Sequence, residues 1–394
     1  MALSYFNPLV TTTADLRRML DSQQITSVQI VEQYLEQIDR YEPVLNALAS
    51  IAPRDSLRRI AESLDDERRG GRVRSPLHGI PIVLKVLCPI SPDAFITASD
   101  LGMPTCAGAA VFAGAKASKN GAIVQMLVDA GLIILAKGNM TEYAGMKTEE
   151  MMPGWSAYGD QTISPYVGPI KRNEKILGHS APGGSSSGPA VAVAAGFSPL
   201  AMGTDRDNRV DRNPLLDILD LSELNIDGKD AIMPIAFWDF KHIGIPTFIE
   251  GFSDAPVASL EEIVRFNEQN QNLTMPEPFT KQDQLLRALD IAGTSEEIAQ
   301  LKRRLRETGK SIINRVLDAE NVNCIAAPAD SAICIYTAAA GYPHITIPLK
   351  KLNYNGRPFG ICVMARENDE AVLLRFMAAY ESMTAPRSVP SLVF

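Results

Sequence analysis

The chain is poor in the residues that bind metals and cross-link small domains. It has four histidines and five cysteines in 394 residues. No histidine has an acidic or cysteine neighbour at ligand spacing, so we predict neither a metal site nor a cofactor. The cysteines are odd in number and lack Cys-x-x-Cys spacing, which is typical of buried thiols in a reducing compartment. These residues are His78, His179, His242, His344, Cys88, Cys106, Cys324, Cys334 and Cys362.

Basic clusters and long apolar runs are also missing. The formal net charge is −8, from 38 Lys+Arg against 46 Asp+Glu, without a basic block. We therefore expect no nucleic-acid partner and no attraction to an anionic membrane. The first residues have no basic segment followed by an apolar run, so no signal or transit peptide is indicated, and we expect a cytoplasmic protein. The longest uncharged stretch near the C-terminus, residues 331–349, contains Pro343 and Pro348. It is predicted to be buried strand and turn rather than a membrane span.

The N-terminal half shows the pattern of an α/β fold. Thr26 and Gln29 match a capping box in front of apolar residues at helical spacing. The charged segment AESLDDERRGGRVR is expected to be exposed, and the apolar run LHGIPIVLKV predicts a buried strand that carries Lys85. Residues 119–136 predict a helix followed by a strand, and PAVAVAAG predicts a helix that begins at the glycine- and serine-rich run before it.

The C-terminal half has three helix starts: Ser259 with Glu262, Thr294 with Glu297, and Asn368 or Asp369. The segments VNCIAAPAD and FGICVMA predict buried strands. Without an internal repeat or a long linker, the sequence favours a single α/β domain over residues 1–394. Its parts are an N-terminal helical region (1–78), a region with the lysine strand and the glycine- and serine-rich run (79–210), a divergent segment (211–236) and a C-terminal part (237–394).

Three features occur together: Lys85 in an apolar strand, GGSSSG at 183–188 and GTD at 203–205. With GIP at 79–81 and AKGNMTEY at 136–143, they resemble the amidase signature family. The resemblance implies an α/β/α sandwich around a mixed β-sheet and hydrolysis of a carboxylic amide by a Ser/cis-Ser/Lys triad. It also implies a small amide or carboxylate ligand and no cofactor.

The resemblance assigns roles to individual residues. Lysine has an ordinary pKa of about 10.4, so Lys85 serves as a base near neutrality only where burial disfavours its charged form. Ser185 would be the bridging serine, held by a cis peptide bond after the preceding glycine, and would relay a proton to Lys85. Thr204 and Asp205 would brace the loop that carries the nucleophile. The other supporting or binding positions are Gly183, Gly184, Ser186, Ser187, Arg206, Asp207 and Asn208.

The nucleophile position departs from the family. Arg209 stands where the family has its serine, and a guanidinium is always protonated and offers no lone pair for attack. Asn208 stands where a glycine would let the backbone turn its N–H groups toward an oxyanion. Val86 replaces a residue that is usually acidic. Residues 211–236 form a shortened segment that would supply one helix rather than several strands, and the lost strands would expose sheet edges.

Three hypotheses remain open. In the first, the protein is a pseudoenzyme that binds a small amide or carboxylate, with Arg209 as an anion-binding group. In the second, a serine among residues 185–187 attacks with Lys85 as base. In the third, the shortened chain needs a partner for stability. The plainer alternatives are that Lys85 reaches the surface and pairs with a carboxylate, that the serines form a flexible loop, and that Arg209 is solvated.

Overall fold

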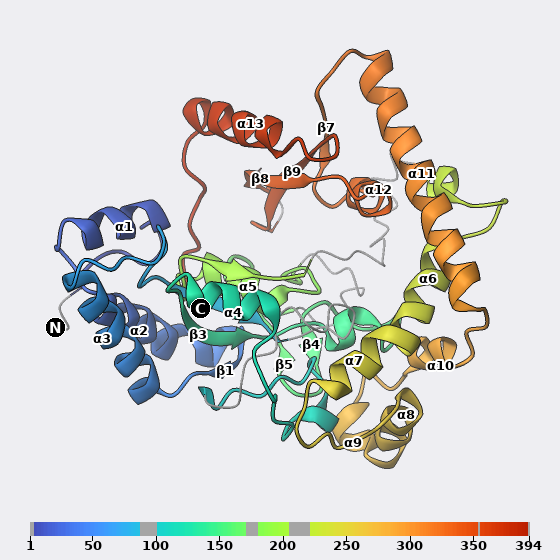
Figure 1. The fold of residues 1–394 in the computed structure, drawn as a ribbon, viewed down its shortest axis with the longest axis horizontal. Helices are drawn as coiled ribbons and strands as arrows, with labels where there is room; N and C mark the ends of the chain where they lie inside the picture. Colours follow the sequence, from blue (N-terminus) through green and yellow to red (C-terminus); the bar gives the residue numbers. More distant parts are fainter. Residues whose placement is uncertain (1–3, 87–100, 171–179, 205–220, 354, 393–394) are drawn as a thin grey trace. The chain divides into compact units, whose positions relative to one another are not determined.

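The computed structural model describes residues 4–86, 101–170, 180–204, 221–353 and 355–392. The chain divides into two compact units. Figure 1 draws the whole chain in colours that follow the residue numbers. Unit 1 holds residues 1–204, 240–289 and 389–394, and unit 2 holds residues 205–239 and 290–388. The single domain expected from the sequence stays a prediction.

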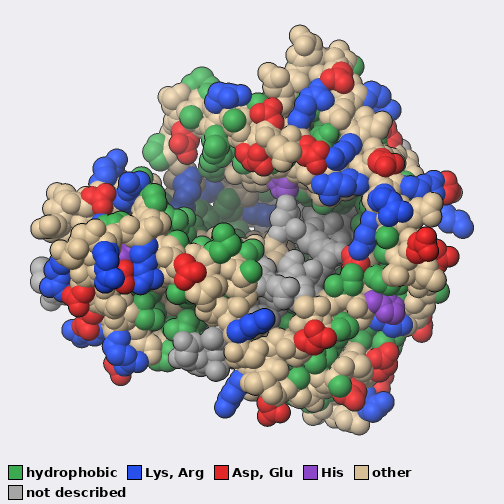
Figure 2. Space-filling view, viewed as in Figure 1, with side chains coloured by type: hydrophobic (Ala, Val, Ile, Leu, Met, Phe, Trp, Pro, Cys, Tyr) green, Lys and Arg blue, Asp and Glu red, His purple; other side chains and the backbone are tan. Residues whose placement is uncertain are grey.

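Charged side chains of both signs are interspersed over the face of the molecule drawn in Figure 2. Many form exposed pairs, such as Arg58 with Glu62 one helical turn away at 3.0 Å. Exposed pairs of this kind stabilise a fold little. Within the described ranges, no helix combines the length and the apolar character that crossing a bilayer requires.

The centre of unit 1 is a four-stranded sheet in the order β1-β3-β2-β6. Strand β2 pairs in parallel with β3 and β6, whereas β1 pairs with β3 in antiparallel, so the sheet is mixed as expected. Helix α5 packs against all four strands. The strands are β1 (Leu48–Ile51), β2 (Pro81–Lys85), β3 (Ile133–Gly138) and β6 (Ala201–Met202), with a separate hairpin of β4 (Trp155–Ser156) and β5 (Asp160–Gln161).

The helices of unit 1 follow local sequence signals in most places. The capping box at Thr26 and Gln29 is confirmed, because each side chain accepts the backbone N–H of the other residue. The charged segment 61–74 is mostly exposed, as expected. Its first part ends helix α3, where Ala61 and Leu64 continue a buried stripe that includes Leu57. The helices are α1 (Thr13–Asp21), α2 (Ser27–Leu45), α3 (Arg54–Arg69), α4 (Ala122–Asp129), α5 (Ser187–Ala194), α7 (Ile245–Glu250), α8 (Leu260–Gln269), α9 (Gln271–Thr274) and α10 (Asp283–Leu289). Short helical turns lie at η2 (Ala110–Phe112), η3 (Glu142–Gly145) and η5 (Phe240–Gly244).

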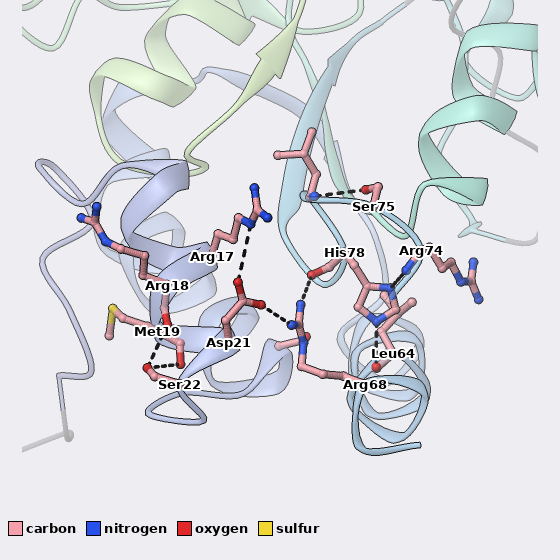
Figure 3. A network of polar contacts seen from close by, with 12 residues as sticks. Arg17, Arg18, Met19, Asp21, Ser22, Leu64, Arg68, Arg74, Ser75 and His78 are labelled. Carbon is pink, nitrogen blue, oxygen red and sulfur yellow. Dashed lines mark hydrogen bonds and ion pairs between the residues drawn. The ribbon is translucent and has the colours of Figure 1, made fainter. Parts of the chain in front are cut away.

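A polar network holds the turn that leads into β2 (Figure 3). The ring of His78 is fully buried, and its Nε2 lies 2.9 Å from the Leu64 carbonyl oxygen. Its Nδ1 accepts the backbone N–H of Arg74 at 3.3 Å. Arg68 donates to the His78 carbonyl at 3.0 Å and to Asp21 at 2.8 Å. These contacts join α1 and α3 to the turn that precedes β2.

Unit 2 is built on an antiparallel sheet in the order β7-β9-β8. Alternate residues of β9 face opposite sides, as the period of a strand requires. Cys362 and Met364 pack in the cluster that includes α11 and α12, while Val363 and Ala365 pack with Leu373 of α13. The elements are η4 (Leu221–Leu224), α6 (Ile232–Asp239), α11 (Ser295–Ala319), β7 (Cys324–Pro328), α12 (Ile333–Ala340), β8 (His344–Lys351), β9 (Pro358–Ala365) and α13 (Glu370–Met383).

Two expectations for unit 2 are wrong. Residues 331–349 were expected to be strand and turn, but residues 333–340 form α12, and only the end of the stretch is strand. An all-apolar run gives no period that separates helix from strand, and alanine favours the helix. Strand β7 was expected to be buried, but it is half-buried because it lies at the edge of its sheet.

Candidate active site

Lys85 ends strand β2 and directs its amine at hydroxyl groups. The residue is fully buried. Its Nζ donates to Ser185 Oγ at 2.7 Å and to Thr204 Oγ1 at 2.5 Å. The alternative of a lysine that reaches the surface is therefore wrong. Burial favours the neutral form of an amine, which is the form that can accept a proton from a hydroxyl group.

The loop before α5 presents Ser185 to this amine. The peptide bond between Gly184 and Ser185 is cis, as the family resemblance implied. Gly183 has a φ of +85°, in the left-handed region that favours glycine. The Ser185 carbonyl accepts the backbone N–H of Thr141 at 3.0 Å. This hydrogen bond fixes the Ser185 carbonyl relative to the turn that contains Thr141.

The three neighbouring serines have different surroundings. Ser186 Oγ accepts the Thr204 N–H at 3.2 Å and donates to the Thr204 carbonyl at 3.3 Å. Ser187 Oγ is buried and donates to the Gly183 carbonyl at 2.5 Å. Among the described contacts, Ser185 alone of the three brings its hydroxyl to Lys85. The structure therefore separates three candidates that the sequence could not.

The first turn of α5 lies against the ends of β1 and β3 with no spare room. The Gly188 N–H donates to the Asn139 carbonyl at 2.9 Å. A Cβ atom on Gly188 would lie 2.2 Å from the Ala47 oxygen, and one on Gly138 would lie 2.6 Å from Pro189 Cδ. Glycine is required at both positions because any side chain would displace backbone or a proline ring.

A polar cluster behind the loop was missed by sequence reasoning. Glu142 and Lys147 form a fully buried ion pair at 2.9 Å. Lys147 also donates to the Thr274 carbonyl, and the other Glu142 oxygen accepts the Ala157 N–H at 2.9 Å. Burial raises the pKa of Glu142, and Lys147 opposes that shift. The only signal in the sequence was an acidic residue five positions before a lysine.

A second buried lysine lies on the neighbouring strand. Lys137 of β3 is paired in register with Leu84, and Gly138 is paired with Lys85. The two lysines therefore project from opposite faces of the sheet. Burial lowers the pKa of Lys137 to about 7, and its Nζ donates to Thr105 Oγ1 at 3.3 Å. The nearby thiol of Cys106 has a pKa raised to about 12 by burial.

Several predicted site residues cannot be placed. Asp205, Arg206, Asp207, Asn208 and Arg209 lie outside the described residues, so the expected departure at the nucleophile position stays a prediction. The lysine's neighbour Val86 is described and fully buried. In the described parts of the chain, no cluster of three or more His, Cys, Asp or Glu side chains is arranged to hold a metal ion.

The segment that contains Lys85, Ser185 and Thr204 is similar to known proteins. A family model described as Amidase matches residues 29–208, which contain Lys85, the loop and Thr204. This part of the chain is therefore similar to amidases. One relative is an Arabidopsis thaliana protein named "Probable amidase", 33% identical over 209 residues, which are 52% of this chain and 37% of the relative. Another is a component of the glutamyl-tRNA(Gln) amidotransferase of Chloroflexus aurantiacus, 37% identical over 183 residues, which are 46% of this chain and 32% of the relative.

The matched segment thus spans about a third of the length of these relatives. Solved structures extend the likeness of fold over the whole chain. The native peptide amidase of Stenotrophomonas maltophilia has a TM-score of 0.79 at 22% identity, over 98% of this chain and 99% of that one. An amidase family protein of Bacillus anthracis has a TM-score of 0.78 at 23% identity, over 97% and 93%. The chain has the amidase-signature α/β fold.

Proposed function

We propose that this protein hydrolyses the C–N bond of a small carboxylic amide, with Lys85 as the base and Ser185 as the nucleophile. The supporting observation is the 2.7 Å contact between Lys85 Nζ and Ser185 Oγ, inside the part of the chain that the Amidase family model matches. A serine hydroxyl becomes a useful nucleophile when an adjacent base takes its proton. Arg209 occupies the family's nucleophile position, so the attack would come from the serine that already contacts the lysine.

The proposed reaction has two halves. In the first, neutral Lys85 accepts the Ser185 proton, Oγ attacks the amide carbonyl carbon, and the C–N bond breaks as the lysine ammonium protonates the leaving nitrogen. An ester with Ser185 remains. In the second, a water molecule gives a proton to Lys85 and attacks the ester, the carboxylic acid leaves, and the proton returns to Ser185. Thr204, which lies 2.5 Å from the amine, orients Lys85 during both halves.

A second candidate function is binding of a small amide or carboxylate without turnover. The sequence GTDRDNR favours it, because Arg209 supplies a permanent positive charge that pairs with a carboxylate. In that case a small carboxylate raises the melting temperature of the wild-type protein but not that of Arg209→Ala, since a ligand stabilises only the state it binds.

The hydrolase proposal is tested with a fluorophosphonate probe and intact-mass analysis of the folded protein. We expect one covalent adduct, which peptide mapping locates on Ser185. Ser185→Ala and Lys85→Met lower the rate of adduct formation by about 100-fold or more, the usual contribution of a positioned base. Ser186→Ala is the matched control and keeps the adduct, because its hydroxyl bonds the Thr204 backbone rather than Lys85.

Two results would refute the hydrolase proposal. The first is an adduct whose rate is the same in Lys85→Met, because the lysine would then not act as the base. The second is no adduct at all on a protein with a cooperative thermal transition. That second result would leave binding without turnover as the function to test.

A further inference from the structure

Thr141 and Glu142 are consecutive residues that contact different parts of the site's surroundings. We propose that Thr141 is a positioning residue for Ser185, coupling the serine loop to the hairpin segment that begins at Gly154. The inference rests on the proposed function, since it concerns the same nucleophile. It assigns a role to a residue that contacts neither Lys85 nor the Ser185 hydroxyl in the described contacts.

The first contact is made by the Thr141 backbone. Its N–H donates to the Ser185 carbonyl at 3.0 Å. Two positions earlier in the same turn, the Asn139 carbonyl accepts the Gly188 N–H at 2.9 Å. The turn after β3 therefore holds both ends of the short segment 185–188. A shift of this turn moves Ser185 relative to Lys85, which is fixed on the neighbouring strand.

The second contact is made by the Thr141 side chain. Its Oγ1 accepts the Gly154 N–H at 2.9 Å. The same oxygen lies against Gly184, where an added Cβ atom would approach it to 2.8 Å. The hydroxyl is thus packed between the backbone of the hairpin segment and the residue that precedes Ser185. Loss of the oxygen would leave a buried N–H without an acceptor, at a cost of about 1–3 kcal/mol.

Glu142, the next residue of the same turn, also contacts the hairpin segment. It accepts the Ala157 N–H at 2.9 Å while pairing with Lys147 at 2.9 Å. Residues 141 and 142 therefore clamp both ends of the segment 154–157. The following two residues, Tyr143 and Ala144, have φ angles of 50° and 57°, in a region that side chains other than glycine seldom adopt. Backbone of this kind persists where surrounding contacts over-determine it.

The test compares Thr141→Val, Thr141→Ser and Thr148→Val. Valine matches the shape of threonine without the oxygen, and serine keeps the oxygen. Thr148 is the matched control because it is also buried, at 1% exposure against 5% for Thr141, but its hydroxyl donates to Asp283 and accepts the Glu150 N–H instead. Adduct formation with the fluorophosphonate is followed over a range of probe concentrations to separate the maximal rate from the binding constant. Hydrogen exchange of the peptide containing residues 183–188 is measured on the same proteins.

We expect Thr141→Val to lower the maximal rate of adduct formation about tenfold, or about 1.4 kcal/mol, with the binding constant unchanged. Thr141→Ser restores the rate, and Thr148→Val does not change it. The 183–188 peptide exchanges faster in Thr141→Val alone, because its local opening costs less free energy.

Equal rates and equal exchange in Thr141→Val and the wild type would overturn the inference. Equal losses in Thr141→Val and Thr148→Val would also overturn it, because general destabilisation would then explain the effect. A wild-type protein that forms no adduct refutes the proposed hydrolysis instead. The exchange comparison still decides the positioning role in that case.

Discussion

Two fully buried lysines of unit 1, Lys85 and Lys147, illustrate what a partner does to a buried amine. The described partners of Lys85 are the hydroxyls of Ser185 and Thr204, whereas Lys147 is paired with the carboxylate of Glu142. A carboxylate stabilises the charged form of an amine, while a hydroxyl can also donate a proton to the neutral form. In the proposed function, Lys85 therefore serves proton transfer, whereas the equally buried Lys147 holds segments together.

The comparison is sharpest if the two lysines are changed to the same residue. Lys147→Met leaves the Glu142 carboxylate buried without its partner, and we expect a loss of about 3–5 kcal/mol in the free energy of unfolding. Urea denaturation measures this loss. The double variant Glu142→Gln with Lys147→Met should recover most of it, since the uncompensated charge is then gone. A loss that is no smaller in the double variant would mean that the ion pair is not the cause.

The third buried lysine, Lys137, gives a pH-dependent effect. Its pKa is lowered by burial to about 7 from 10.5. Between these values the unfolded chain binds more protons than the folded one, so stability rises with pH above about 7. We expect the melting temperature of the wild type to rise relative to Lys137→Met from pH 7 to pH 9. Lys350→Met, at an exposed lysine of β8, is the control and should follow the wild type.

That prediction fails if the melting temperatures of Lys137→Met and the wild type run parallel from pH 7 to pH 9. The range stops at pH 9 because the Cys106 thiol begins to matter above it. Its pKa is raised from 9.0 to about 12. Above pH 9 this thiol binds more protons in the folded chain than in the unfolded one, which opposes the effect of Lys137 on stability.

The smallest effect on stability is expected for Lys85→Met. The change leaves two hydroxyls without their lysine partner, but it also removes the cost of burying an amine. These terms oppose each other, so we expect a change of about 1 kcal/mol or less in the free energy of unfolding. Urea denaturation beside Lys147→Met measures it. A loss as large as that of Lys147→Met would show that Lys85, too, is chiefly structural.

Features encoded within a few residues could be predicted from the sequence. The caps at Thr26, Ser259 and Thr294 are confirmed because the interacting groups lie three residues apart. The buried strand ending at Lys85 is confirmed because a short apolar run bounded by glycine and proline has few other stable conformations. The cis bond at Ser185 followed from the family resemblance rather than from any local pattern.

Contacts between distant segments could not be predicted. Lys147 and Thr274 are 127 positions apart, and Lys85 and Thr204 are 119 apart, so no spacing in the sequence links them. The contacts of Thr141 with Gly154 and Ser185 depend on which loops lie beside it, and no spacing in the sequence indicates them. Helix α12 was missed for a different reason, since a uniformly apolar stretch carries no period from which to choose.

The packing of Gly138 and Gly188 against neighbouring backbone has a consequence for how such a protein changes over time. A substitution at either glycine would have to move the end of β3 and the start of α5 together. We therefore expect few substitutions to be tolerated at these two positions. The start of α5, which follows the serine loop, is therefore retained for packing alone, whatever chemistry the loop supports.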